Sequence, residues 1–409
     1  MCSDTHNVFS LFFHLTRVEE NKSNGIGILV GTDRGDFKDL SVQYRGIMFS
    51  FLRNRFGPRR ERLLGIDVGA AAIKLLALEE GGGSAPRVIR ADIIPLPGDV
   101  FSNNSITKPE RVVEGLAQRS GSTHPARAVT AVPSPSVFIK RITVPRSAGS
   151  ALAAHIQFEA SNLIPHKLDA VKLDYQVLGE GGPGLLDVLI VAVKSDVLES
   201  FTGCLNGAGV ETTIVDVDVF ALQNAFEYSY PEFRERTAAL VDVGARYTSV
   251  NICRGGRMLI SGDIPLGGRT CTEAIMQKLA IGFDEAEGRK IESRSEVRCG
   301  EIEGVVSQWV DAAALDINRQ LGFLWNAASA SGVIDTVMVS GGASLAPGFV
   351  EALALRTEVP CERLDPFRRL DMPAELRAKV GSTDPSKMVV ALGLALRRIG
   401  DKYSAEGQG

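Results

Sequence analysis

The chain has 409 residues, of which 44% are hydrophobic and 23% charged, and its formal net charge is -4. This length and apolar content allow two domains or one bilobed body, and the small negative charge excludes the broad basic surface that nucleic-acid binding requires. The six cysteines form no CxxC pair, so we expect reduced thiols in a cytoplasmic protein and no metal framework. No stretch of the sequence reaches the roughly 18 apolar residues of a membrane span.

The first 47 residues differ in composition from the rest of the sequence. Residues 1–47 mix polar residues with one apolar patch, VFSLFFHL, and Met48 opens a stretch that reads like a natural start. We expect residues 1–62 to be an amino-terminal tail that is either disordered or, before Met48, an over-long start assignment. The arginine-rich run between Arg53 and Arg62 suits an anionic membrane surface, but a solvated terminus explains it better, and we assign the tail no function.

An internal repeat is the strongest pattern in the chain. The stretch LLGIDVGAAAIKLLAL, which begins at Leu63, is echoed by AALVDVGARYTSVNIC, which begins at Ala238. Each copy predicts a strand, an Asp-Val-Gly-Ala turn and a second strand, followed by a glycine-rich turn and a third strand. Two halves built on one motif predict a duplicated, two-lobed α/β fold.

Two helical patterns connect and close these halves. The stretch from Val215 places apolar residues at helical spacing and predicts a helix that links the lobes. The stretch after Pro385 predicts a closing helix, whose small residues Ala391, Gly393 and Ala395 would let it pack closely against a neighbour. Short strands and helices in 137–212 predict an inserted α+β subdomain. The expected domains are the first lobe core (63–136 and 213–230), the inserted subdomain (137–212), the second lobe core (231–268 and 333–400) and its helical subdomain (269–332).

The two Asp-Val-Gly turns predict a phosphate site. Glycine lets backbone N–H groups approach a phosphate closely, and an aspartate at a strand end can hold Mg²⁺, usually through water. One such turn is weak evidence because Asp-x-Gly is common in ordinary turns. Two copies in matched strand contexts are stronger evidence. They predict that Asp67 and Asp242 face each other across a cleft and share the Mg²⁺ that is bound to a polyphosphate.

A third element follows the strand near Val339. Ser340-Gly341-Gly342-Ala343 lies between that strand and a helix predicted from Pro347 onward. A Gly-Gly turn leaves room for a flat ring or a ribose against the backbone. A plain strand-to-helix loop is the alternative, but beside two phosphate turns we favour the ligand.

The order of these motifs resembles the actin-like ATPase superfamily, and within it the PilM family of type IV pilus assembly, which is related to the cell-division protein FtsA. The resemblance spans residues 63–398. The segments that carry it include GIDVGAAAIKLLALE, IQFEASNLIPHKLDAVKLDYQVLG, LVDVGARYTSVNIC, DIPLGGRTCTEAI and VMVSGGASLAPGFVEAL. The resemblance implies a bilobed actin-like fold of duplicated ribonuclease-H-like domains, with an inserted α+β subdomain of the FtsA and PilM type.

The resemblance also implies a binding site for ATP and Mg²⁺. Glu287 and Lys290, in DEAEGRKIE, would flank the base and ribose, although a solvated helix face is nearly as good a reading. The implied nucleotide contacts come from the first turn, the second turn and the Gly-Gly loop: Asp67, Gly69, Ala70, Ala71 and Lys74; Asp242, Gly244, Ala245 and the Thr248 hydroxyl; Gly341 and Gly342.

Two features bear on catalysis. Relatives commonly carry Ser or Thr in the first turn, where this chain has alanine at positions 70–72, and each lost hydrogen bond to phosphate costs about 1 kcal/mol. Hydrolysis also requires a polar group that orients or deprotonates water, usually at the start of the linking helix. Asp218 is the first candidate and Asp216 the second, with helix capping as the alternative role for either. We expect slow turnover at most.

The resemblance implies one protein partner. In the family, a groove between the inserted subdomain and the first lobe binds the amino-terminal cytoplasmic segment of the inner-membrane protein PilN. Glu159, Ile164 and Pro165 are candidate groove residues, with core packing and helix termination as the alternatives for the last two. The resemblance thus implies a cytoplasmic pilus adaptor that is peripheral at the inner membrane through its partner, with self-association left open.

Two other functions stay open. An FtsA-like filament protein of cell division is disfavoured because the final LRRIGDKYSAEGQG is short and polar, unlike an amphipathic membrane helix. A metabolite kinase of the same superfold would need a catalytic carboxylate poised for a substrate hydroxyl and a substrate loop, and the sequence offers neither clearly.

Overall fold

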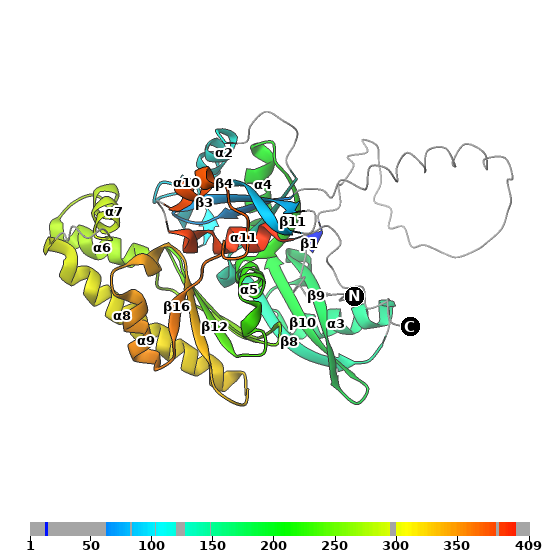
Figure 1. Ribbon diagram of the computed structural model, residues 1–409. Coiled ribbons are helices and arrows are strands. Elements are labelled where there is room, and N and C mark those ends of the chain that lie inside the picture. The colour runs from blue at the N-terminus through cyan, green and yellow to red at the C-terminus, as the bar shows by residue number, and fades with distance from the viewer. Residues whose placement is uncertain are drawn as a thin grey trace, which may run out of the picture. The chain divides into compact units, whose positions relative to one another are not determined.

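The internal repeat forms two sheets of matching connectivity in the computed structural model (Figure 1). In each sheet three consecutive antiparallel strands are followed by strands that pair in parallel. The predicted duplication is therefore confirmed. The structure describes residues 13–14, 63–81, 84–102, 104–119, 127–147, 149–294, 300–381 and 384–397.

The first sheet has the strand order β1-β11-β7-β2-β3-β4. Its central strands read as nearly continuous apolar runs because both faces are covered, as in parallel sheets generally; Leu64, Ile66 and Val68 of β2 are all buried. The strands are β1 (Phe13–His14), β2 (Leu64–Val68), β3 (Ala72–Gly81), β4 (Ser84–Pro95), β7 (Arg127–Val132) and β11 (Glu211–Val217).

The second sheet has the order β14-β13-β12-β15-β16, so β12 and β15 correspond to β2 and β7. Its largest cover is α8 (Gly300–Ala327), which buries residues such as Val306, Val310 and Ile317 at helical spacing. The strands are β12 (Ala238–Val243), β13 (Thr248–Arg254), β14 (Arg257–Ile264), β15 (Thr336–Ser340) and β16 (Cys361–Arg363).

A smaller antiparallel sheet of order β8-β10-β9 has a core of its own. It comprises β8 (Val137–Pro145), β9 (Val171–Gly182) and β10 (Leu185–Lys194), with α3 (Gly149–Leu163) packed on it. The next helix, α4 (Ser195–Gly207), packs instead on the core of the first sheet, with Phe201 and Leu205 fully buried there. The separate layer therefore ends near Lys194, ahead of the predicted boundary at 212.

The remaining elements are short or cover the sheets. The predicted helix after Pro347 begins at Phe349, after one 3-10 turn. The remaining helices are α2 (Pro109–Ala117), α5 (Asp218–Ser229), α6 (Gly268–Leu279), α7 (Phe283–Glu292), α9 (Phe349–Thr357), α10 (Ala374–Gly381) and α11 (Val389–Ala395). The 3-10 turns are η1 (Ser134–Ser136), η2 (Leu168–Ala170), η3 (Pro231–Phe233), η4 (Gly342–Leu345) and η5 (Pro385–Met388). A two-stranded ladder pairs β5 (Phe101–Ser102) with β6 (Ser105–Ile106).

The linking helix α5 and the closing helix α11 pack against each other at the junction of the lobes (Figure 1). Buried residues of both helices share one core with β3 and β12. A Cβ on Gly393 would lie 1.8 Å from the Ala221 carbonyl oxygen, and a Cβ on Gly65 would lie 2.5 Å from that of Ala391. The predicted close packing of α11 is confirmed.

Among the described residues, no helix is both long and apolar enough to span a bilayer.

Candidate functional site

The two Asp-Val-Gly turns are built alike. The Gly69 N–H donates to the Ala72 carbonyl at 3.1 Å, and the Gly244 N–H donates to the Tyr247 carbonyl at 3.0 Å. Each closing bond bypasses two residues, 70–71 in the first turn and 245–246 in the second. Within the described ranges the backbone N–H groups of these four residues donate to no protein acceptor. Free N–H groups in tight turns are what an anion such as phosphate binds.

The first turn holds a lysine beside its aspartate. Lys74 lies opposite Asp67 in the β2–β3 register, and its Nζ donates to Asp67 Oδ2 at 2.9 Å. Both side chains are mostly buried, at 20% and 16% exposed. A Cβ at position 69 would lie 2.6 Å from the Lys74 Nζ, so glycine at 69 leaves the lysine room to reach over the turn.

The second turn places Asp242 near this pair. Asp242 Oδ1 accepts a hydrogen bond from the Ser340 hydroxyl at 2.7 Å. Burial raises the pKa of Asp242, the Ser340 bond and the Lys74 charge lower it, and the Asp67 charge raises it further. The carboxylates of the two turns therefore repel each other across Lys74, and a divalent cation would relieve that repulsion.

Thr248 is not directed toward the turns. It is fully buried, and its hydroxyl donates to the Leu266 carbonyl at 2.8 Å.

The Gly-Gly loop lies against the second turn. Gly341 has φ 86°, and a Cβ there would lie 2.4 Å from the Val243 carbonyl oxygen, so only glycine fits. The carbonyl of Gly342 accepts from Arg294 Nη2 at 2.9 Å. The loop thereby joins the second turn to the residues that follow α7.

A small cavity opens between this loop and helices α6, α7 and α8. Its lining comprises Gly268, Cys271, Lys290, Ser293, Arg294, Val306, Trp309, Ala343 and Ala346. Arg294, Trp309 and Cys271 were missed by sequence reasoning; the four-residue spacing of Arg294 from Lys290 was the available signal.

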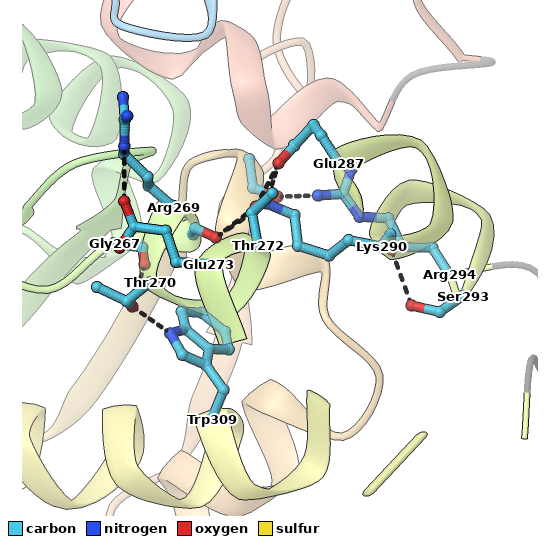
Figure 2. Close-up of polar contacts among 12 residues, drawn as sticks. Gly267, Arg269, Thr270, Thr272, Glu273, Glu287, Lys290, Ser293, Arg294 and Trp309 are labelled. Atoms are coloured by element: carbon cyan, nitrogen blue, oxygen red, sulfur yellow. Dashed lines mark hydrogen bonds and ion pairs between the residues drawn. The ribbon is translucent and has the colours of Figure 1, made fainter. Parts of the chain in front are cut away.

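Lys290 points into the protein (Figure 2). Its Nζ donates to the Gly268 carbonyl at 2.9 Å, to Thr272 Oγ1 at 2.7 Å and to Glu287 Oε2 at 2.6 Å. Burial lowers the pKa of Lys290, and the Glu287 carboxylate opposes that shift. A solvated helix face therefore does not describe Lys290, whose cation is fixed at the cavity wall by Glu287.

Asp218 lies beside the second turn and belongs to a buried polar network. Its Oδ1 accepts from the Ser134 N–H at 2.9 Å, and its Oδ2 accepts from the Tyr247 hydroxyl at 2.5 Å. Burial and then the charge of Asp263 raise the pKa of Asp218 to about 8. Asp263 Oδ1 in turn accepts from the hydroxyls of Ser134 and Ser249, each at 2.7 Å. Sequence reasoning did not find this second carboxyl group.

Asp216 has a different environment. Its Oδ2 accepts from Arg397 Nε at 2.6 Å and lies 2.5 Å from Nη2, and both side chains are fully buried. This ion pair ties β11 to the chain just beyond α11. Of the two predicted catalytic aspartates, the geometry favours Asp218, because the carboxylate of Asp216 is committed to this pair.

Two arginines connect the lobes at the edge of the site. Arg246, in the second turn, donates from Nη1 to the Phe101 carbonyl at 3.0 Å. Arg269 donates from Nη1 to the Gly98 carbonyl at 2.6 Å and lies over the ring of Phe283. The loop after β4 is thus held by side chains of the second lobe.

The three predicted partner residues lie at and just after the end of α3. Pro165 is exposed and Glu159 is partly exposed. Ile164 is 6% exposed and packs in the core of the three-stranded sheet, which matches the alternative reading of core packing. The same helix exposes Phe158 and Leu163, which sequence reasoning did not select.

Comparisons with known proteins identify relatives of this fold. A family model described as type IV pilus assembly protein PilM matches residues 65–399. A solved chain of a PilM-PilN type IV pilus biogenesis complex has 23% identity and a TM-score of 0.72, covering 83% of this chain and 98% of that one. The ethanolamine utilization protein EutJ of Carboxydothermus hydrogenoformans is 17% identical with a TM-score of 0.49, over 82% and 89% of the two chains.

The cell division protein FtsA of Staphylococcus epidermidis is 27% identical over 105 residues, which are 25% of this chain and 21% of that protein. The chain thus matches about a fifth of the length of this curated relative. The family match and the structural likeness confirm the predicted family and the predicted bilobed actin-like fold.

Proposed function

The chain belongs to the family of type IV pilus assembly protein PilM, and we propose that it is an ATP-binding adaptor of the pilus assembly machinery. In this role it docks the amino-terminal cytoplasmic segment of a PilN-like inner-membrane protein. The observation that carries the nucleotide part is the pair of matching turns, each with free N–H groups, on either side of Asp67, Lys74 and Asp242.

The residues present fit Mg-ATP. The N–H groups of residues 70–71 and 245–246 would hold phosphate oxygens, and Lys74 would pair with a phosphate charge in place of Asp67. Asp67 and Asp242 would hold Mg²⁺ through its water shell, and the cation would neutralise charge on the phosphates. The Gly341-Gly342 backbone would lie against the adenosine, with the base toward the cavity wall at Lys290.

Asp218 is the residue that we propose for orienting the attacking water. Its carboxyl group accepts from the hydroxyl of Tyr247, which ends the second turn, and this contact supports a position beside the proposed phosphate. Because its pKa is raised to about 8, much of it is protonated at neutral pH and a poor proton acceptor. Slow ATP hydrolysis follows from this protonation. The role of ATP is then to bias the closure of the lobes and the shape of the partner groove.

The partner role rests on family membership and on the layout of the small sheet. The solved relative is a PilM-PilN complex. In this chain the layer of β8, β9 and β10 stands beside the first sheet (Figure 1). Phe158 on α3 and Pro165 just after it are exposed, and Glu159 is partly exposed. Through such a partner the protein is cytoplasmic and peripheral at the inner membrane.

Capture by an immobilised PilN-like amino-terminal peptide tests the adaptor role. The full chain is applied with and without Mg-ATP, and a scrambled peptide is the control. Retention on the PilN-like peptide alone supports the role, and a change with nucleotide supports coupling. No retention in either condition contradicts the adaptor proposal.

A further inference from the structure

The loop that follows β4, residues 96–101, lies between the two lobes, and we call it the strap. The Leu96 N–H donates to the Ala71 carbonyl of the first turn at 2.9 Å. At the other end of the strap, Val100 and Phe101 are buried in the core of the first lobe. The strap is therefore fixed to the first lobe at both ends, and its carbonyl groups are available to the second lobe.

Two arginines of the second lobe hold this strap. Arg269 donates from Nη1 to the Gly98 carbonyl at 2.6 Å, and Arg246 donates from Nη1 to the Phe101 carbonyl at 3.0 Å. Arg269 also pairs with Glu273, four residues further along α6 (Figure 2). A guanidinium group that donates to a carbonyl makes a charge-assisted hydrogen bond, which is stronger than a neutral one. We call these two bonds between the lobes the latch.

The strap also packs on helix α7. A Cβ on Gly98 would lie 2.4 Å from the nearest atom of the Phe283 ring, so the strap backbone lies directly on that ring. Arg269 covers the same ring, with its Cζ 5.1 Å from the ring centroid. Phe283 is the first residue of α7, the helix that carries Glu287 and Lys290. The strap therefore contacts the first turn, the second turn and α7, three elements of the proposed nucleotide site.

The charges around the latch link it to a bound anion. Burial and then the charge of Arg269 lower the pKa of Arg246, and the Glu273 carboxylate opposes this shift. The Arg246 Nε is buried and has no hydrogen-bond partner among the described residues. The two guanidinium groups thus repel each other. The backbone N–H of Arg246 is one of the free donors of the second turn, so a phosphate there would bring negative charge beside this pair and reduce the repulsion.

We propose that the strap is a gate of the nucleotide site, that Arg246 and Arg269 hold it closed across the two lobes, and that phosphate at the second turn strengthens this hold. The gating of nucleotide rests on the proposed function. The latch itself does not, since it is argued from the contacts between the lobes. Because nucleotide enters and leaves through the same opening, a gate slows both steps.

Two variants weaken the latch from opposite lobes. Arg269→Met removes one of its hydrogen bonds, and Gly98→Ala places a methyl group against the Phe283 ring. The matched controls are Arg319→Met, at an exposed arginine of α8, and Gly282→Ala, where a Cβ meets nothing within 4 Å. Stopped-flow fluorescence measures the association and the dissociation of N-methylanthraniloyl-ATP, with Mg²⁺, on the full chain and on each variant.

We expect both latch variants to bind and to release the fluorescent nucleotide about fivefold faster or more, since each loses contacts that hold the gate. The two controls should match the wild type. Unchanged rates in both latch variants overturn the gate. Faster dissociation with unchanged association also overturns it, because the strap then contributes only to the affinity of the bound state.

Hydrogen exchange of the strap amides, followed by mass spectrometry, separates the latch from the proposed function. Exchange should be faster in Arg269→Met than in Arg319→Met, and Mg-ATP should slow it in the wild type, whereas adenosine, which has no phosphate, should not. Equal exchange in the two variants overturns the latch, and equal slowing by adenosine contradicts its dependence on phosphate. A wild-type chain that binds no fluorescent nucleotide disproves the proposed nucleotide function, while faster exchange in Arg269→Met leaves the latch standing.

Discussion

Tyr247 donates its hydroxyl to Asp218 Oδ2 at 2.5 Å, and in doing so it connects the second Asp-Val-Gly turn to the first residue of the linking helix. Burial and the Asp218 charge raise the pKa of Tyr247 well above its usual range, so the phenol remains a donor at every physiological pH. The bond in turn lowers the pKa of Asp218, against the larger raising effect of burial. The acidity of the candidate catalytic group is therefore set partly by the opposite lobe.

The first prediction concerns the pH dependence of ATP hydrolysis. If ionised Asp218 accepts the proton, kcat rises with pH and levels off above about 8. Tyr247→Phe removes a bond that favours the carboxylate, so the inflection should move to higher pH. Steady-state phosphate release between about pH 6 and 9.5 measures it. Tyr228→Phe, which removes a hydroxyl bonded to the Arg369 carbonyl, should leave the inflection in place; a shift of the same size in this control would contradict the assignment.

The second prediction concerns stability. Because the pKa of Asp218 is raised in the folded protein, the folded state binds more protons than the unfolded state between about pH 4 and 8. Its contribution is thus present at low pH and lost as pH rises through 8. Asp218→Asn cannot ionise, so its free energy of unfolding relative to wild type should increase by about 3 to 4 kcal/mol from about pH 5 to pH 8. Urea unfolding at each pH tests this, and a difference that does not change with pH would disprove it.

The sequence was sufficient for features that depend on local pattern. Apolar periodicity and glycine spacing marked the repeated strand–turn–strand unit, and small residues marked the packing face of α11, because each is written in adjacent residues. Contacts between residues far apart in the sequence could not be predicted from such local patterns. Arg397, which pairs with Asp216, is 181 residues away, and Asp263 is 129 residues from Ser134. Only the fold shows that Asp216 is held in an ion pair while Asp218 is beside the turn.

The third prediction separates the roles of Lys74 and Asp242. Lys74→Met removes the cation that we propose to face the phosphate, so ATP affinity should fall about tenfold or more with or without Mg²⁺. Asp242→Asn preserves an acceptor for Ser340 but removes the charge that we propose to face Mg²⁺, so the loss of ATP affinity should appear only with Mg²⁺ present. Titration calorimetry with ATP, in Mg²⁺ and in EDTA, measures both. Asp169→Asn, an exposed carboxylate on the small layer, is the control. Equal effects of Asp242→Asn in the two buffers would contradict the metal role.

The fourth prediction restores a hydroxyl to the first turn. Ala71 is exposed at the turn, so serine fits there without disturbing the core. One added hydrogen bond to phosphate contributes about 1 kcal/mol, so Ala71→Ser should tighten ATP binding by roughly fivefold. Ala208→Ser, at the end of α4 and away from both turns, provides the comparison. Weaker binding by Ala71→Ser would show that the phosphate does not lie over this turn.

The fifth prediction tests the close packing at the lobe junction. A Cβ at Gly393 would lie 1.8 Å from the Ala221 carbonyl oxygen, and that atom belongs to helix backbone, which cannot rotate away as a side chain can. Gly393→Ala should therefore force α5 and α11 apart and destabilise the protein by about 3 kcal/mol. Gly322 is the matched control, since it lies within helix α8 and a Cβ there meets nothing within 4 Å. Gly322→Ala should stabilise by about 0.5–1 kcal/mol, because alanine favours the helix. Thermal and urea unfolding of both variants give the comparison, and equal stabilities would mean that the two helices are free to separate at little cost.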